Sequence, residues 1–146
     1  MTTINLTPCF DAKTEGDNRE WALARYMGIN RTVHDTKAYD KASDVEVGAL
    51  KISVKASGFS LMSGSLCKGL TTFDEIWNLF ESNVHSNTFA YVTADYTCYL
   101  MNLATFKKFV YQFCSLDRES KSNGGAIKIK CRRETKKMLA WLEAEI

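Results

Sequence analysis

The chain has 146 residues, of which 45% are hydrophobic and 25% are charged, and its formal net charge is +2. These proportions are ordinary for a globular protein and predict one domain with a substantial core. A net charge this small does not by itself indicate nucleic-acid binding. The sequence has no apolar run of the roughly 18 residues that predict a membrane span, and its N-terminus lacks the pattern of a secretory signal.

The cysteines predict buried thiols rather than a disulfide framework or a zinc site. They are scattered, odd in number and without a C-x-x-C spacing, at Cys9, Cys67, Cys98, Cys114 and Cys131. The two histidines, His34 and His85, do not bracket them. We therefore expect a reducing, cytoplasmic location. A catalytic pair of one cysteine and one histidine is the alternative.

The N-terminal part predicts an arm followed by a helix. Residues 1–14 are polar and weakly patterned, which predicts an arm or an edge segment. The next helix is predicted to begin with Asp17 as its cap and Glu20 completing a capping box. Gly28 is predicted to end it. Residues 29–42 are then expected to connect this helix to a hairpin.

Strict alternation of apolar and polar residues over 44–47 and 50–55 predicts two half-buried strands. Gly48-Ala49 falls where a two-residue turn would join the strands into a hairpin. Such a turn places Asp44 opposite Ser53. One face of the hairpin is then aliphatic, and the other collects the polar side chains Asp44, Glu46, Lys51, Ser53 and Lys55.

At these residues the sequence resembles the PD-(D/E)xK nuclease superfamily, which places an Asp on one strand and an acid-x-Lys on the next. Asp44 stands in the Asp position, and Ser53-Val54-Lys55 stands in the acid-x-Lys position. The departure is Ser53, a hydroxyl where the second carboxylate belongs. An acidic residue on the preceding helix often joins the family's site, and Glu20 matches it. Glu46 is the other candidate for the missing acid.

The resemblance implies a restriction-endonuclease-like fold and a metal-dependent phosphodiesterase that acts on DNA with Mg²⁺ or Mn²⁺. Asp44, with Glu20 or Glu46, would bind the metal. Lys55 would stabilise the attacked phosphate, with Ser53 as a neutral group beside it. Two alternatives stay open: Glu20 only caps its helix, or the polar face belongs to an ordinary edge hairpin in which Glu46 pairs with Lys51.

The remaining elements predict an α+β fold, in which a central mixed sheet of about five strands is flanked by helices. A Thr72–Glu75 capping box begins a helix, strands follow over 89–93 and 97–103, and a further helix covers 105–113. The last third is predicted to hold a polar loop over 115–125, a strand over 126–131 and a helix over 132–146.

Basic residues concentrate in this last third. Lys128 and Lys130 share one face of the predicted strand, and Arg132 and Arg133 fall at the predicted helix start, where the helix dipole disfavours cations. Together with Lys51, these four residues are candidate contacts to a nucleic-acid backbone. A solvated charged face is the alternative.

The resemblance to the nuclease superfamily implies DNA as the partner, with a two-fold dimer if both strands of a duplex are cut. A second hypothesis follows from Ser53. In it, the protein is a catalytically silent module from a phage or other mobile element. Such a module would bind nucleic acid or inhibit a host defence protein.

Overall fold

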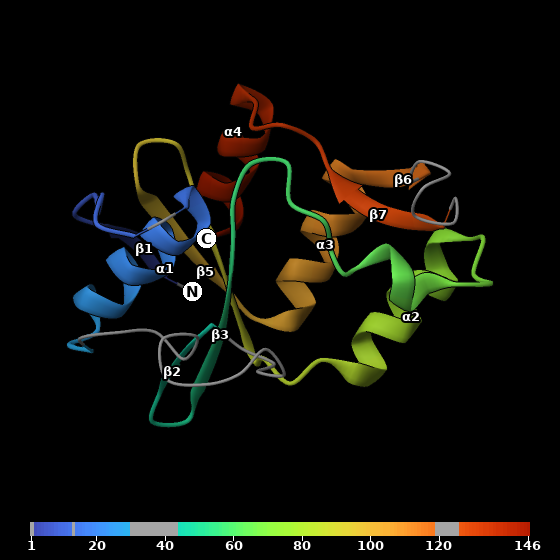
Figure 1. Ribbon diagram of the computed structural model, residues 1–146. Helices are drawn as coiled ribbons and strands as arrows, with labels where there is room; N and C mark the ends of the chain where they lie inside the picture. Colours follow the sequence, from blue (N-terminus) through green and yellow to red (C-terminus); the bar gives the residue numbers. More distant parts are fainter. Residues whose placement is uncertain (1, 13, 30–43, 119–125) are drawn as a thin grey trace.

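A five-stranded mixed sheet forms the centre of the fold in the computed structural model, which describes residues 2–12, 14–29, 44–118 and 126–146 (Figure 1). The sheet has the strand order β1-β5-β4-β3-β2, where the strands are β1 (Thr2–Asn5), β2 (Val45–Val47), β3 (Leu50–Lys55), β4 (Thr88–Val92) and β5 (Thr97–Met101). The other elements are α1 (Glu15–Tyr26), the 3-10 helix η2 (Gly64–Cys67), α2 (Phe73–Asn83), α3 (Leu103–Phe113), the ribbon strands β6 (Cys114–Arg118) and β7 (Ile127–Cys131), and α4 (Lys136–Glu145). The expected α+β class and five-stranded mixed sheet are confirmed.

The hairpin β2–β3 has the predicted register. Val45 pairs with Ile52, and Glu46 pairs with Lys51 across the strands. The turn contains Gly48 at a φ of +57°, a conformation that glycine adopts without a Cβ penalty. Burial explains the register, because a slip by one residue would expose Ile52, which is fully buried here.

Strands β3 and β4 run parallel, and α2 lies in the connection between them. Strand β5 returns antiparallel to β4, and β1 adds antiparallel to β5 at the sheet edge. The predicted N-terminal edge segment is therefore a strand. Because parallel strands end on the same side of a sheet, the residues that follow β3 and β4 lie at one common edge.

The two faces of the sheet have separate cores. Ile52 and Ala90 pack with Leu23 of α1, whereas Phe89 faces Phe106 of α3. The Phe89 and Phe106 rings stack with centroids 4.2 Å apart and an interplanar angle of 1°. Figure 1 shows the same division, with α1 on the left of the sheet and α2 and α3 on the right. No helix in the described parts of the chain is long and apolar enough to cross a bilayer.

The predicted capping of α1 is wrong. Thr14 is the N-cap, and its Oγ1 accepts the amide N–H of Asp17 at 3.1 Å. The helix therefore begins at Glu15, before the predicted Asp17 cap, and Glu20 lies beyond its first turn. Thr14 and Asp17 both carry acceptors that can cap a helix, and the chain uses the earlier one. The Thr72–Glu75 capping box of α2, by contrast, is confirmed.

The C-terminal third also differs from the prediction. Residues 114–118 form β6 rather than a polar loop, since β7 supplies backbone partners along their whole length. Helix α4 begins at Lys136 with Thr135 as its cap. Arg132 and Arg133 therefore precede the helix. The expectation that they lie at the helix start, where the dipole disfavours cations, is wrong.

Candidate functional site

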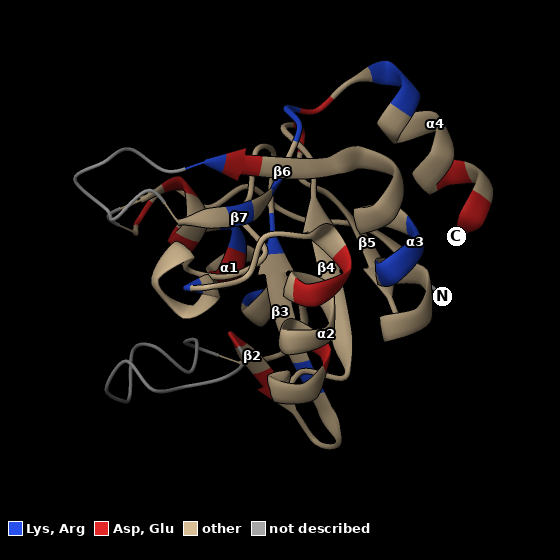
Figure 2. Cartoon of the chain, turned by 90° about the vertical axis from the view of Figure 1, so that its right-hand side faces the viewer, with Lys and Arg blue, Asp and Glu red and all other residues tan. Residues whose placement is uncertain are grey.

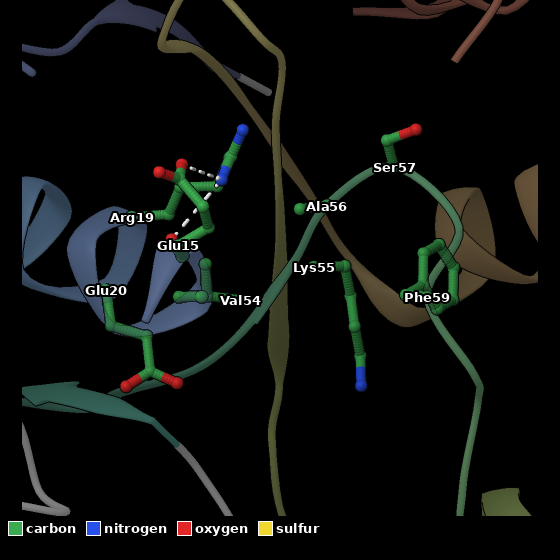
Figure 3. A pocket seen from close by; sticks show the side chains of 9 residues that line it. Glu15, Arg19, Glu20, Val54, Lys55, Ala56, Ser57 and Phe59 are labelled. Carbon is green, nitrogen blue, oxygen red and sulfur yellow. Dashed lines mark hydrogen bonds and ion pairs between the residues drawn. The ribbon is translucent and has the colours of Figure 1, made fainter. Parts of the chain in front are cut away.

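A pocket of about 500 Å³ lies where β3 ends, and we call it the β3-end pocket (Figure 3). Helix α1 forms one side of it, and the end of β3 with the following loop forms the other. Its lining residues are Glu15, Gly16, Arg19, Glu20, Val54, Lys55, Ala56, Ser57 and Phe59. The carboxyl end of a parallel strand is a common location for ligand sites in open sheets.

Helix α1 contributes both signs of charge to this pocket. The Arg19 guanidinium binds the Glu15 carboxylate at 3.1 Å, one helical turn away, and its side chain is only 13% exposed. Its guanidinium carbon also lies 5.4 Å from the ring centre of Tyr96. Glu20 follows Arg19, and one oxygen of its carboxylate is inaccessible to solvent. Glu20 does not cap α1, so the alternative that Glu20 only caps its helix is wrong.

Asp44 lies beside the same part of β3. Its amide donates to the carbonyl of Ile52 at 2.8 Å, and its Oδ2 accepts the amide N–H of Val54 at 2.8 Å. The carboxylate thereby continues the hairpin ladder past the end of β2. This hydrogen bond places the Asp44 carboxylate next to the residue that precedes Lys55.

Lys55 ends β3 and is partly buried. Its Nζ lies 5.6 Å from the ring centre of Phe59. Burial lowers the pKa of Lys55 below its ordinary value of 10.5, and the negative charges of Asp44 and Glu20 oppose that shift. The structure therefore places three of the predicted site residues, Glu20, Asp44 and Lys55, around the same end of β3. Figure 3 shows the Glu20 and Lys55 side chains on either side of the β3 backbone.

Ser53 shares a face of β3 with Lys55, and the two residues line a second pocket of about 230 Å³. The rest of its lining is largely apolar and comprises Leu61, Met62, Leu66, Phe80, Asn83, Val84, His85, Ser86 and Phe89. None of the described residues lining it is a cysteine, and all five cysteines are buried. The pocket therefore gives no support to a pair of His85 with a cysteine, and His34 lies outside the described residues.

Glu46 and Lys51 are exposed and lie opposite each other near the hairpin turn. Neither residue lines the two pockets at β3. Lys51 also donates its amide N–H to Oδ1 of Asn87 at 3.0 Å. Of the two candidates for the missing acid, the structure thus places Glu20, and not Glu46, at the pocket.

The predicted basic residues lie along β7 and the connection that follows it (Figure 2). Lys128 is opposite Asp117 on β6, and Lys130 is opposite Ser115. We call Lys128, Lys130, Arg132 and Arg133 the basic strip.

The connection after the basic strip is joined to the β3-end pocket through Glu134. The Glu134 amide donates to Oγ of Ser57 at 2.9 Å, and its Oε1 accepts the Tyr91 hydroxyl at 3.2 Å. Sequence reasoning missed both Glu134 and Arg19. The i, i+4 spacing of Glu15 and Arg19 is a local signal for their ion pair. No local signal marks Glu134, because these two partners are 77 and 43 positions away.

Two of the predicted metal ligands, Asp44 and Glu20, lie around the end of β3. Within the described ranges, no three or more His, Cys, Asp or Glu side chains gather closely enough to hold a metal ion. Asp44 and Glu20 nevertheless offer carboxylate oxygens, and Mg²⁺ is commonly bound by one or two carboxylates together with water and phosphate oxygens. The hydrogen bond from Val54 does not conflict with this role, since a carboxylate accepts at several positions.

Comparisons of the chain with protein-family models, with curated proteins and with solved structures found no match.

Proposed function

We propose that this protein is a metal-dependent phosphodiesterase of the PD-(D/E)xK type that acts on DNA. One observation carries the proposal: Glu20 lines the β3-end pocket together with Lys55, and Asp44 accepts the amide N–H of Val54, the residue before Lys55. A lysine whose pKa is lowered by burial, in a pocket that also holds a carboxylate, is a candidate functional group.

The order of elements supports a restriction-endonuclease-like fold. Helix α1 precedes the hairpin β2–β3, and α2, two strands and α3 follow it in a mixed sheet. The hairpin carries Asp44 beside its first strand and Lys55 at the end of its second. This is the arrangement that the resemblance at the hairpin leads us to expect.

Asp44 and Glu20 would hold the metal ion. When bound, that ion would neutralise charge at the scissile phosphate and make a water molecule more acidic. The Val54 amide orients the Asp44 carboxylate through its hydrogen bond. Lys55 would place its ammonium where negative charge develops on the phosphate, and its low-polarity surroundings would strengthen that interaction. Ser53 offers only a neutral hydroxyl at the position of the family's second acid.

The basic strip supplies a route for the phosphate backbone of DNA. Lys130, Arg132 and Arg133 are exposed. Glu134, which follows them, is tied to Ser57 in the lining of the β3-end pocket. A DNA strand bound along these cations would therefore pass close to Lys55. The affinity of the protein for DNA would fall as salt concentration rises.

The test is cleavage of plasmid, linear, single-stranded and branched DNA, and of RNA, in the presence of Mg²⁺ or Mn²⁺. We expect the wild-type protein to cut DNA and EDTA to abolish cutting. The variants Asp44→Asn, Glu20→Gln and Lys55→Met should each lower the rate by about a hundredfold or more. Full metal-dependent cleavage by folded Asp44→Asn and Lys55→Met proteins would refute the assignment.

Two variants serve as matched controls. Asp17→Asn removes a carboxylate from α1 at a position outside the pocket lining, and Lys108→Met removes an exposed lysine from α3. Both should keep the wild-type rate. A loss of activity in either control would show that the assay reports on general charge or on folding.

Ser53 favours a second candidate function, a catalytically silent protein of the same fold that binds nucleic acid or a host defence protein. Its hydroxyl lines a largely apolar pocket where a ligating carboxylate would be required. The same experiment separates the two functions. Folded wild-type protein that retains DNA without cutting any substrate in the panel would support the silent module.

A further inference from the structure

Cys114 and Cys131 face each other across the two-stranded ribbon, at the first position of β6 and the last of β7. Neither backbone amide bonds to the opposite residue. The Cys131 amide donates to the carbonyl of Phe59 at 2.7 Å, and the Cys114 amide donates to the carbonyl of Val110. The two cysteines therefore occupy a non-hydrogen-bonded pair, in which opposite Cα atoms of antiparallel strands are about 4.5 Å apart.

This position satisfies the main geometric requirement of a disulfide. Disulfide-bonded cysteines have Cα atoms roughly 4.4–6.8 Å apart. The neighbouring Cys131 thiol and burial both raise the pKa of the Cys114 thiol. Both residues are nearly enclosed, with exposures of 8% for Cys114 and 3% for Cys131. They are thus well placed to join each other, and their burial should slow the first reaction with an external oxidant.

We propose that Cys114 and Cys131 form a reversible disulfide when a low-molecular-weight disulfide, such as oxidised glutathione, is the oxidant. The Sγ of one cysteine loses its proton and attacks the oxidant, which forms a mixed disulfide and releases one glutathione thiol. The Sγ of the second cysteine loses its proton and displaces the other glutathione thiol. The pair gives up two electrons, and one disulfide is reduced to two thiols.

The disulfide would act on the surroundings of Lys55, and this consequence rests on the proposed function. Cys114 and Cys131 belong to the core cluster against which Phe59 packs. The Lys55 ammonium also lies over the Phe59 ring, and the Phe59 carbonyl holds the amide of Cys131. A covalent bond between the cysteines would fix the end of β7, whose Cys131 amide is hydrogen-bonded to Phe59. It would thereby restrain the ring that lies beneath the Lys55 ammonium.

The test needs no DNA, so its result is independent of the nuclease proposal. Folded protein is equilibrated with graded ratios of oxidised to reduced glutathione, quenched with acid and alkylated, and its peptides are analysed by mass spectrometry. We expect two of the five cysteines to become protected, in one linked peptide pair that contains Cys114 and Cys131. Burial of both thiols predicts slow formation, and a reducing agent should reverse it.

Cys131→Ala should abolish the linked pair, whereas Cys98→Ala, which removes a buried cysteine from the other core, should retain it. The oxidised wild-type protein should also unfold at a higher urea concentration than the reduced protein, because the bond constrains the unfolded chain. Oxidation should not raise the midpoint of Cys131→Ala. The proposal is overturned if folded wild-type protein keeps all of its thiols under conditions that oxidise the urea-unfolded chain, if other cysteines pair, or if only glutathione adducts form.

Discussion

The carboxylate of Asp44 accepts the amide N–H of Val54 at 2.8 Å, so the residue that we propose as a metal ligand also completes the backbone ladder of the hairpin. Val54 itself lines the β3-end pocket and is followed by Lys55. One side chain thus has a structural and a proposed chemical role. Suitable substitutions should separate the two.

Asp44→Asn and Asp44→Ala should differ in stability but agree in activity. The Asn side chain keeps an oxygen that can accept from Val54, whereas Ala leaves that amide without its acceptor. We expect Asp44→Ala to lower the free energy of unfolding by about 1–3 kcal/mol and Asp44→Asn to lower it clearly less. Urea unfolding measures this difference. Both variants should lose metal-dependent cleavage, and equal stabilities would show that the hydrogen bond contributes little.

Lys55→Met should leave the protein at least as stable as the wild type at neutral pH. Burial lowers the pKa of Lys55 in the folded state below 10.5, so the unfolded chain holds this proton more tightly than the folded protein. Stability of the wild type therefore rises with pH between the lowered pKa and 10.5. We expect the free energy of unfolding of Lys55→Met to exceed that of the wild type by roughly 1 kcal/mol at neutral pH.

That advantage should shrink as the pH approaches 10.5 from below. The measurement is a series of urea midpoints for the wild type and Lys55→Met from neutral to alkaline pH, with Lys108→Met as the exposed-lysine control. A wild-type protein that is clearly more stable than Lys55→Met at neutral pH would show that Asp44 and Glu20 outweigh the cost of burial.

Glu75 should stabilise α2 in a pH-dependent manner. Its carboxylate accepts hydrogen bonds from Thr71 and Thr72, which lower the pKa of Glu75 below its ordinary value of 4.5. The stabilisation is therefore present above pH 4.5 and is lost as the pH falls through the lowered pKa. We expect Glu75→Gln to unfold at a lower urea concentration than the wild type near neutrality, and the difference to vanish in acid.

Thr72→Ala provides the complementary measurement. It removes the N-cap hydroxyl, whose oxygen accepts the amide of Glu75 at 3.3 Å, and should cost about 1 kcal/mol at neutral pH. If the wild type and Glu75→Gln differ by the same urea midpoint from neutral to acid pH, the charge on Glu75 is not the source of its contribution to stability.

The basic strip should determine how DNA binding depends on salt. Replacing an arginine or lysine that contacts a phosphate removes about one unit from the slope of log K against log salt concentration. We expect Lys130→Ala and Arg133→Ala each to show this change, with weaker binding to every DNA sequence tested. Lys108→Ala, on α3, is the matched control. Unchanged slopes in both strip variants would place the phosphate contacts elsewhere on the protein.

Several elements follow from the sequence because their causes are local. The alternation through β2 and β3, interrupted at Gly48, predicts the hairpin and its register, since only this register buries the aliphatic face. The Thr72–Glu75 pair predicts the start of α2, because the two partners are three residues apart. For α1, the sequence predicts Asp17 as the cap, whereas the chain uses Thr14, which lies earlier in the sequence.

Other features depend on segments that are far apart in the chain. Residues 114–118 look like a polar loop, and they form a strand only because β7 lies beside them. Glu20 reaches the surroundings of Lys55 because α1 packs on the same sheet that carries β3. The sequence by itself therefore determined the local periodicities, the turn and the α2 cap, through interactions within a few residues. The tertiary structure decided which carboxylate lines the pocket with Lys55, because packing between distant elements places Glu20 of α1 beside the end of β3.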